Sequence, residues 1–329
     1  MRYILIILSI IFSFTVYSCS SKDESASDTS TNSTDNSTVE VTAVTTIAGT
    51  GSKGLKDSSC YNCSVIRVGT SASFRNPKGI TTDGTNLYVV DTWNHTIRMM
   101  NISTGQVSTL VGSPGFSSST YAVANDEVDT THGEWKPSGT FYFPQGITID
   151  GTNLYVADTD NHLIRKIEYA PQTISEWVVT TLAGKIGSLG SANGTGKSAS
   201  FWHPRVITKV GTNLYILSDS NIGLFLRQIV ISTGVVTTVA LAGSPTFNSP
   251  EGITTDGTNL YVADTSNHLI RKIVISTAVV TTLAGTGSIG SADGTGASAS
   301  FNYPKGITIV GTNLYVVDTW NHLIRKIEM

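Results

Sequence analysis

The chain has 329 residues, enough for two average domains or for a single barrel or propeller. Charged residues make up 14% and hydrophobic residues 40%, against roughly 25% charged in an ordinary domain, and this balance excludes intrinsic disorder over most of the chain. The net charge of −3, with no run of five basic residues, excludes the electrostatic signature of a nucleic-acid-binding protein.

The first 19 residues have the pattern of a bacterial export signal. Arg2 precedes an apolar run at 3–16, which is too short for a comfortable membrane span but suits the apolar region of a signal peptide. The run ends in Val-Tyr-Ser-Cys, which resembles the lipobox of bacterial lipoproteins, and this resemblance implies that Cys19 is lipidated. Tyr17 departs from the small residue usual there, so cleavage beside Cys19 by an ordinary signal peptidase is the alternative. Ser21 provides no acidic retention signal, which favours anchoring to the outer membrane.

Residues 20–39 predict a disordered tether. They read SSKDESASDTSTNSTDNSTV and contain no aromatic and almost no aliphatic side chain. Such a segment cannot bury enough apolar surface to offset the entropy of ordering. A coil of this length reaches roughly 25 Å, which would hold a folded domain just clear of a membrane surface.

One pattern recurs five times in the rest of the chain. Its first copy reads PKGITTDGTNLYVVDTWNHTIR, and a phenylalanine stands three residues before the proline of every copy. The copies begin at Pro77, Pro144, Pro204, Pro250 and Pro304, between 46 and 67 residues apart. Periods of this length suit a blade of four short strands with its loops, so the chain is a repeat protein.

Each copy contains the signals of four strands. In the first copy, residues 79–82 form a short strand, the Asp-Gly pair at 83–84 predicts a tight hairpin turn, and residues 87–90 are aromatic or β-branched. The second strand is apolar on both faces, which is typical of a sheet covered on both sides. Residues 95–100 and 106–110 complete the unit as its third and fourth strands.

The two ends of the repeat array predict how the ring closes. The fifth copy stops after its third strand, whereas residues 42–52 repeat the fourth-strand sequence at 277–288 with one residue fewer. We therefore expect residues 41–48 to lie beside residues 323–327 as the fourth strand of the last blade. Such pairing would cover an edge that otherwise invites aggregation.

These motifs carry a family resemblance. The string P-x-G-I followed by DG-x-x-LYVAD-T-x-NH-x-IRK resembles the NHL repeat over about residues 41–329. The resemblance implies an all-β fold, a β-propeller of four-stranded blades, with residues 40–329 as one domain. NHL propellers commonly have six blades, but residues 113–140 lack the repeat signature, so we expect five blades, with six as the alternative.

Polar residues that recur in every blade are expected to hold the blade together. The Asp-Thr-x-Asn-His motif lies between the second and third strands, where short Asp, Thr and Asn side chains can bond turn amides and the histidine can donate across a loop. One histidine per blade spreads these rings too far apart for one zinc ion with bonds near 2.0–2.1 Å. The motif therefore predicts structural caps.

Residues that vary at a fixed position in the repeat are the candidates for recognition. The second-to-third strand loops and the connections between blades share one face of a propeller, and loops on one face of a repeat array carry binding. Tryptophan and tyrosine offer large contact areas with few rotatable bonds, which suits protein or carbohydrate ligands. The candidate ligand-binding residues are Arg75, Trp93, Tyr142, Trp202, His203, Tyr303 and Trp320. The alternative for each is simple packing between loops.

The residue after each repeat proline forms a second variable set. These residues are Lys78, Gln145, Arg205, Glu251 and Lys305, three cations, one anion and one amide. If they surround the central opening, they make a mildly positive mouth that favours an anionic ligand.

The remaining cysteines are Cys60 and Cys63, spaced as C-x-x-C. In an oxidising compartment they can form a disulfide with a small loop, and they lack the preceding strand and following helix of a redox enzyme. We expect a structural bridge or an incidental dithiol.

These observations favour a membrane-anchored extracytoplasmic propeller that acts as a binding or interaction scaffold. Its expected partners are a protein or a glycan, with membrane contact through the lipid only, no nucleic acid, and a monomeric state. The alternative is a metal-dependent lyase or a lactonase-like enzyme with its site in the central channel, as similar propellers include such enzymes. The first strands offer hydroxyls and hydrocarbon and no ligand set, so we expect no enzyme, metal or cofactor. A structural module without a small ligand is the third possibility.

Overall fold

The structure, a computed structural model, describes residues 47–58, 69–112, 140–170, 177–218, 224–242 and 246–329. All of them belong to one compact unit of the chain, residues 45–329. The predicted signal peptide with Cys19, the predicted tether at 20–39 and the pair Cys60 and Cys63 lie outside the described residues.

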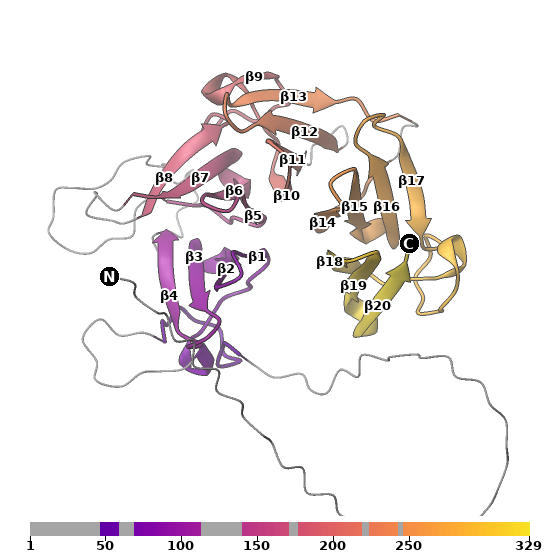
Figure 1. Cartoon of the computed structure of the whole chain (residues 1–329), viewed down its shortest axis with the longest axis horizontal. Helices are drawn as coiled ribbons and strands as arrows, with labels where there is room; N and C mark the ends of the chain where they lie inside the picture. Colours follow the sequence, from indigo (N-terminus) through magenta and orange to yellow (C-terminus); the bar gives the residue numbers. More distant parts are fainter. Residues whose placement is uncertain (1–46, 59–68, 113–139, 171–176, 219–223, 243–245) are drawn as a thin grey trace, which may run out of the picture. The chain divides into compact units, whose positions relative to one another are not determined.

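The described chain forms five small antiparallel sheets, the five predicted blades (Figure 1). Blade 1 contains β1 (Ile80–Thr82), β2 (Asn86–Asp91), β3 (Thr96–Asn101) and β4 (Val107–Gly112). Blade 2 contains β5 (Ile147–Ile149), β6 (Leu154–Asp158), β7 (Leu163–Tyr169) and β8 (Trp177–Ala183). Blade 3 contains β10 (Pro204–Val210), β11 (Asn213–Ser218), β12 (Phe225–Val230) and β13 (Val235–Val239), with β9 (Gly194–Thr195) beside β13. Blade 4 contains β14 (Gly252–Thr255), β15 (Asn259–Asp264), β16 (Leu269–Val274) and β17 (Val280–Ala284). Blade 5 contains β18 (Pro304–Val310), β19 (Asn313–Asp318) and β20 (Leu323–Glu328).

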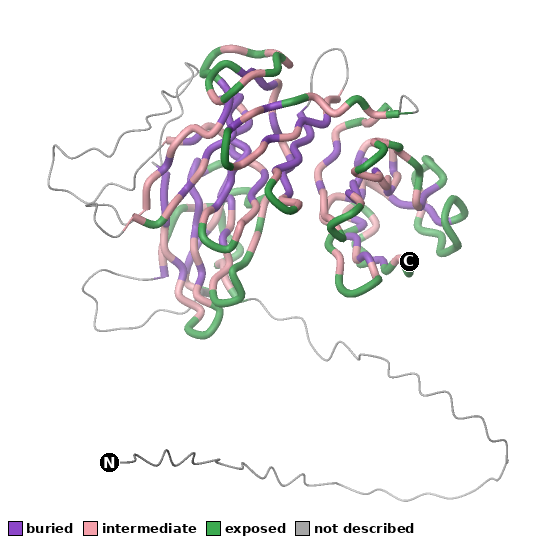
Figure 2. Tube along the Cα trace, turned by 45° about the horizontal axis from the view of Figure 1, so that its top comes forward, coloured by how far each residue is buried: buried purple, intermediate pink, exposed green. Residues whose placement is uncertain are grey.

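The blades confirm the predicted all-β propeller, and most of them have four strands. Consecutive strands pair as hairpins, and the Asp-Gly pairs stand at the first turn of blades 1, 2 and 4. One-turn 3-10 helices η1 (Gly69–Ser71), η4 (Gly196–Ser198) and η6 (Gly296–Ser298) precede blades 1, 3 and 5. Figure 2 shows burial along the inner strands and exposure at the turns.

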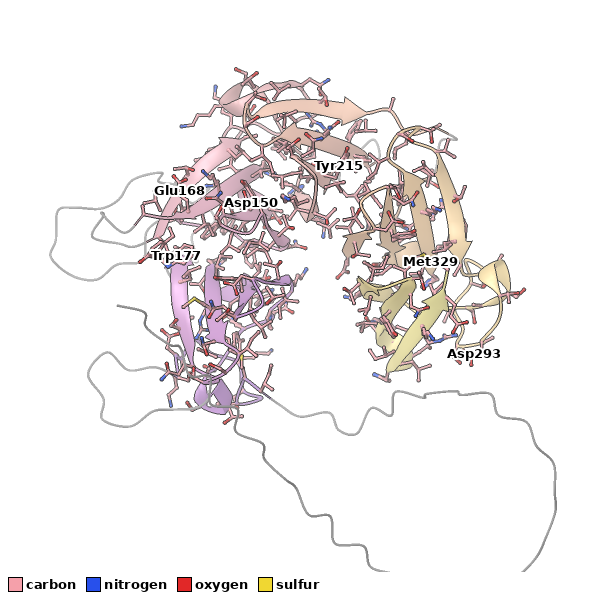
Figure 3. All side chains as sticks on the ribbon, viewed as in Figure 1. Asp150, Glu168, Trp177, Tyr215, Asp293 and Met329 are labelled. Atoms are coloured by element: carbon pink, nitrogen blue, oxygen red, sulfur yellow. The ribbon has the colours of Figure 1, made fainter. Side chains whose placement is uncertain are left out.

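The hydrophobic core is divided among the junctions between successive blades. At the first junction, Val90 and Ile97 of blade 1 pack against Leu154 and Val156 of blade 2, and all four are at most 1% exposed. Strand β6 is buried along its whole length because a neighbouring sheet covers each of its faces, as its continuous apolar sequence predicts. Side chains fill the space between the sheets in Figure 3, where Trp177 of blade 2 meets blade 1.

The last blade departs from the prediction. Strand β20 is the outer strand of a three-stranded sheet, and Ile324 on it is 69% exposed. Residues 41–46 of the predicted closing strand lie outside the described residues. Ile47 and Ala48, the two that are described, pack on blade 1 and belong to no strand beside β20, so these two residues do not form the expected pairing of 41–48 beside 323–327.

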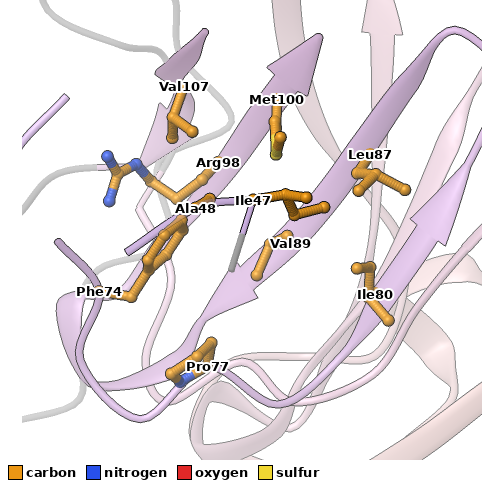
Figure 4. Close-up of a pocket in the computed structure, with 10 residues that line it drawn as sticks. All are labelled: Ile47, Ala48, Phe74, Pro77, Ile80, Leu87, Val89, Arg98, Met100 and Val107. Atoms are coloured by element: carbon orange, nitrogen blue, oxygen red, sulfur yellow. The ribbon is translucent and has the colours of Figure 1, made fainter. Parts of the chain in front are cut away.

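A shared packing role explains why the sequence pattern misled here. Ala48 corresponds to Ala284 of blade 4, which pairs with β16 and also packs against Phe301, ahead of blade 5. Ala48 packs in the same way against Phe74, ahead of blade 1. Ala48 and Ile47 line a cavity of about 190 Å³ that extends across blade 1 from Ile80 to Val107. Figure 4 shows these residues. The sequence pattern shared by these two segments therefore reflects how each packs on the blade that follows it.

Candidate functional site

The Asp-Thr-x-Asn-His turns form a repeated frame on one face of the propeller. In four blades the motif forms a one-turn 3-10 helix between the second and third strands: η2 (Thr92–Asn94), η3 (Thr159–Asn161), η5 (Thr265–Asn267) and η7 (Thr319–Asn321). The preceding aspartate accepts a hydrogen bond from the backbone N–H of the residue after the repeat phenylalanine, at 2.6–2.8 Å. The four pairs are Asp91 with Arg75, Asp158 with Tyr142, Asp264 with Asn248, and Asp318 with Asn302. The aspartates therefore bind backbone amides as predicted, but each bonded amide lies 16 residues earlier in the chain, and none of the four aspartates caps its own turn.

A buried arginine in the third strand completes this frame. Arg98 donates to the Asp91 carboxylate and the Ser73 carbonyl, both at 3.0 Å, and its guanidinium lies 5.0 Å from the Phe74 ring centre. The same arrangement recurs in blade 2, where Arg165 and Asp158 are both fully buried. Burial raises the pKa of Asp158 to about 6, although Arg165 opposes this shift. Sequence reasoning missed this group, although an arginine at one position of every repeat was its signal.

The motif histidine joins each blade to the next. Its backbone has positive φ, and in three blades its Nδ1 accepts a hydrogen bond from the backbone N–H of the residue before the next repeat proline. The pairs are His95 with Phe143 at 3.1 Å, His162 with His203 at 3.2 Å, and His268 with Tyr303 at 3.1 Å. The histidines therefore accept where donation was expected. Burial lowers the pKa of His95, and it lowers the pKa of His162 to about 4, which keeps the rings neutral at pH 7.

The variable aromatic residues stand at these junctions, which places them on the face that carries the turns. Between blades 1 and 2, Tyr142 stacks on His95 at 5.6 Å and Trp93 meets Phe143 edge-on at 6.2 Å. The guanidinium of Arg75 lies 5.3 Å from the Trp93 ring centre. Trp93 is nevertheless 46% exposed, so packing occupies only part of its surface.

A second aromatic group stands between blades 4 and 5. Tyr303 contacts His268 edge-on at 4.7 Å and lies 4.6 Å from the ring of Trp320. Trp320 is 62% exposed, which makes it more exposed than Trp93 and the half-buried Trp202.

A third group of predicted residues, His203 and Trp202, lies between blades 2 and 3. His203 meets His162 edge-on at 4.6 Å, and its Nε2 lies 3.9 Å from the Asp160 carboxylate. Trp202 is half-buried, and its carbonyl accepts a hydrogen bond from Ser218, which replaces the repeat aspartate. The structure thus places the seven predicted residues at the blade junctions in separate groups, and we define this surface as the loop face.

The five residues that follow the repeat prolines lie at or just before the start of the first strand of each blade, and we call them the axial ring. A Cβ added to Gly79 would collide with the carbonyl oxygen of Gln145 in the next blade, and the same close approach joins Gly146 to Arg205 and Gly252 to Lys305. Lysine Nζ atoms bridge two of these steps, Lys78 to the amide oxygen of Gln145 and Lys305 to Glu251, both at 3.1 Å.

Electrostatic interactions connect this ring across several blades. Burial lowers the pKa of Lys78; Glu251 opposes this shift, whereas Arg205 and Lys305 add to it. Burial raises the pKa of Asp160, and His203, Arg205 and Lys78 oppose that shift. The charges that act on Lys78 of blade 1 therefore come from the other four blades, from Asp160, Arg205, Glu251 and Lys305.

The described ranges contain neither a candidate group of metal ligands nor a candidate membrane-spanning helix. Within those ranges, no group of three or more His, Cys, Asp or Glu residues is placed to hold a metal ion. No helix in the same part of the chain is long and apolar enough to cross a membrane.

The fold and its repeated turns define a five-bladed β-propeller, and comparison with known proteins identifies the type of repeat. The NHL repeat family matches residues 141–167 and 247–273, which are in blades 2 and 4. The chain is an NHL-repeat β-propeller protein.

Curated relatives share the repeats over part of their length. NHL repeat-containing protein 2 of Bos taurus is 33% identical over 116 residues, which cover 34% of this chain and 14% of that protein. The Gallus gallus protein of the same name is 27% identical over 298 residues, covering 77% of this chain and 38% of that protein. The chain therefore spans well under half of these relatives.

A solved structure shares the fold. The crystal structure of the nidogen/laminin complex contains a chain that matches with a TM-score of 0.50 and 15% sequence identity, covering 77% of this chain and 75% of that one. At this identity the likeness concerns the fold alone.

Proposed function

We propose that this protein is an extracytoplasmic binding scaffold that holds a protein or glycan ligand on its loop face. The observation that carries the proposal is the contrast between two sets of side chains on that face. The recurrent residues are buried in the frame, as Asp158 and Arg165 are, whereas the variable Trp93 and Trp320 remain 46% and 62% exposed.

The exposed rings suit recognition because their neighbours hold them in place. Arg75 packs over Trp93, and Tyr303 packs beside Trp320, so each indole is partly ordered before a ligand arrives. Ordering in advance reduces the entropy lost on binding, and aromatic side chains contribute a large share of interface energy. The nidogen match provides a precedent for the fold alone.

The location is a proposal carried by the sequence. The apolar run at 3–16, followed by Cys19 and a polar segment, supports export and lipid anchoring. Mass spectrometry of the amino-terminal peptide, after expression of the full chain in a bacterium with an outer membrane, tests this directly. A mature chain that starts at a lipidated Cys19 supports the anchor, and an unmodified start beside Cys19 refutes it; Cys19→Ser is the control.

Binding arrays test the proposed function. The full chain is applied to arrays of glycans and extracellular proteins, together with Trp93→Ala and Trp320→Ala. Tyr169→Ala is the matched control, because Tyr169 is 52% exposed and lies at the far end of β7, away from the turns. We expect array binding that the two tryptophan substitutions weaken and the control retains. Equal binding by all four proteins would refute the loop face as the site.

A further inference from the structure

The axial ring has a composition that the frame does not explain. Its side chains vary among Lys, Gln, Arg and Glu, whereas the frame repeats the same aspartate and histidine in four of the five blades. Glycine close approaches fix the backbone beneath it, so the side chains stand on a rigid base. We infer that the axial ring binds a sugar acid, with the carboxylate of the ligand held by Lys78 and Arg205. This inference rests on the proposed function, since it names the ligand class for the loop face.

The charges at this place favour an anion. Lys305 pairs with Glu251 at 3.1 Å, and Lys78 interacts with Arg205 and Lys305 as well as with Glu251 and Asp160, so three cations stand against two carboxylates. The lowered pKa of Lys78 reflects lost hydration and the nearby cations. A bound carboxylate would offset both effects, because opposite charges attract more strongly where water is partly excluded.

The same carboxylates favour a sugar acid over a phosphate. A phosphate dianion would be repelled by Glu251 and Asp160, which lie within the cluster. A sugar acid has one negative charge per ring and several hydroxyl groups, and those hydroxyls can donate to the carboxylates and to the amide oxygen of Gln145. The ring of mixed charge therefore matches a ligand that combines a monoanion with many hydrogen-bond donors.

The aromatic groups of the loop face add a second point of agreement. Tyr142 is three residues before Gln145, and Tyr303 is two residues before Lys305, so both tyrosines are close along the chain to the axial ring. Aromatic rings bury the apolar faces of sugars while their polar edges stay hydrated. An oligosaccharide can thus contact the axial ring and the aromatic groups together.

Calorimetric titration with a short oligogalacturonate tests the inference on the full chain. We expect saturable binding that weakens with added salt and that falls about tenfold or more when the carboxylates are methyl-esterified, equivalent to about 1.4 kcal/mol. Lys78→Glu and Gln145→Glu, which add negative charge to the ring, should each weaken binding by a similar factor. Lys185→Glu, an equal charge change at an exposed loop position after β8, should leave binding unchanged. Circular dichroism confirms that each variant is folded.

Three results would overturn the inference. The methyl ester could bind as tightly as the free oligogalacturonate. Lys78→Glu and Gln145→Glu could both bind it as tightly as the unchanged protein. Oligoglutamate could bind as tightly as the oligogalacturonate. The array experiment keeps the two proposals separate. If Trp93→Ala and Trp320→Ala abolish array binding while Lys78→Glu does not affect it, the loop face stands and the sugar-acid assignment falls.

Discussion

Substitution of His162 by alanine should weaken the junction between blades 2 and 3. The change removes the Nδ1 acceptor of the His203 N–H at 3.2 Å and an edge-on ring contact at 4.6 Å. An unsatisfied donor costs about 1–3 kcal/mol and the ring contact contributes about 0.5–1.5 kcal/mol, so the free energy of unfolding should fall by about 2–4 kcal/mol.

The repeat provides a matched control in His322. It has the same left-handed backbone, with φ of 59° against 60° for His162, but it lies at the free end of blade 5 and is exposed. His322→Ala should therefore change the free energy of unfolding by less than about 0.5 kcal/mol. Urea-induced unfolding followed by tryptophan fluorescence measures both variants. An equal loss in the two would refute the reasoning, because it would mean that blade 5 contacts a following surface as blade 2 does.

Three further predictions concern the frame. The destabilisation caused by His162→Ala should be largest near pH 7 and shrink as pH falls from 6.5 toward 4. The pKa of His162 in the folded protein is lowered to about 4, so the stability that the neutral ring contributes is present above the unfolded pKa and is lost on acidification. Urea midpoints of both proteins across this pH range measure the effect, and a constant difference would contradict it. Asp158→Asn breaks the fully buried pair with Arg165 and should cost about 3–5 kcal/mol, and a thermal midpoint equal to that of the wild type would disprove the role of the pair. Ser218→Asp restores the repeat aspartate in blade 3, where burial lowers the pKa of Arg227 to about 10. The new carboxylate should stabilise the protein by about 1 kcal/mol in urea unfolding. A lower urea midpoint would show that blade 3 has adapted to serine.

Repeat spacing made the blades predictable. Five copies with an Asp-Gly turn and a doubly apolar strand allow few arrangements other than stacked sheets, and the hairpins lie where these signals placed them. A structural role for the repeat aspartates was also predictable, because a short acceptor beside a turn has few other roles, but the distant amide that each one binds was not.

Three-dimensional partners were not predictable from the repeat. Arg98 lies between apolar neighbours in sequence, and only folding shows that Asp91 and the Ser73 carbonyl surround it. The histidines accept hydrogen bonds because an N–H of the next blade reaches Nδ1, which is a contact between residues 35–48 positions apart. For the predicted closing strand, the described Ala48 packs on blade 1, a contact that its repeat pattern alone did not distinguish from pairing with β20.

The central claim is that recurrent residues hold the propeller together while variable residues of the loop face bind the ligand. One panel tests it directly: Asp158→Asn and His162→Ala from the first set, and Trp93→Ala, Trp320→Ala and Lys78→Glu from the second, each measured for thermal midpoint and for ligand affinity of the folded protein. We expect the first set to lower the midpoint with affinity retained, and the second set to lower affinity with the midpoint retained. The opposite division, or loss of both properties in both sets, would contradict the claim.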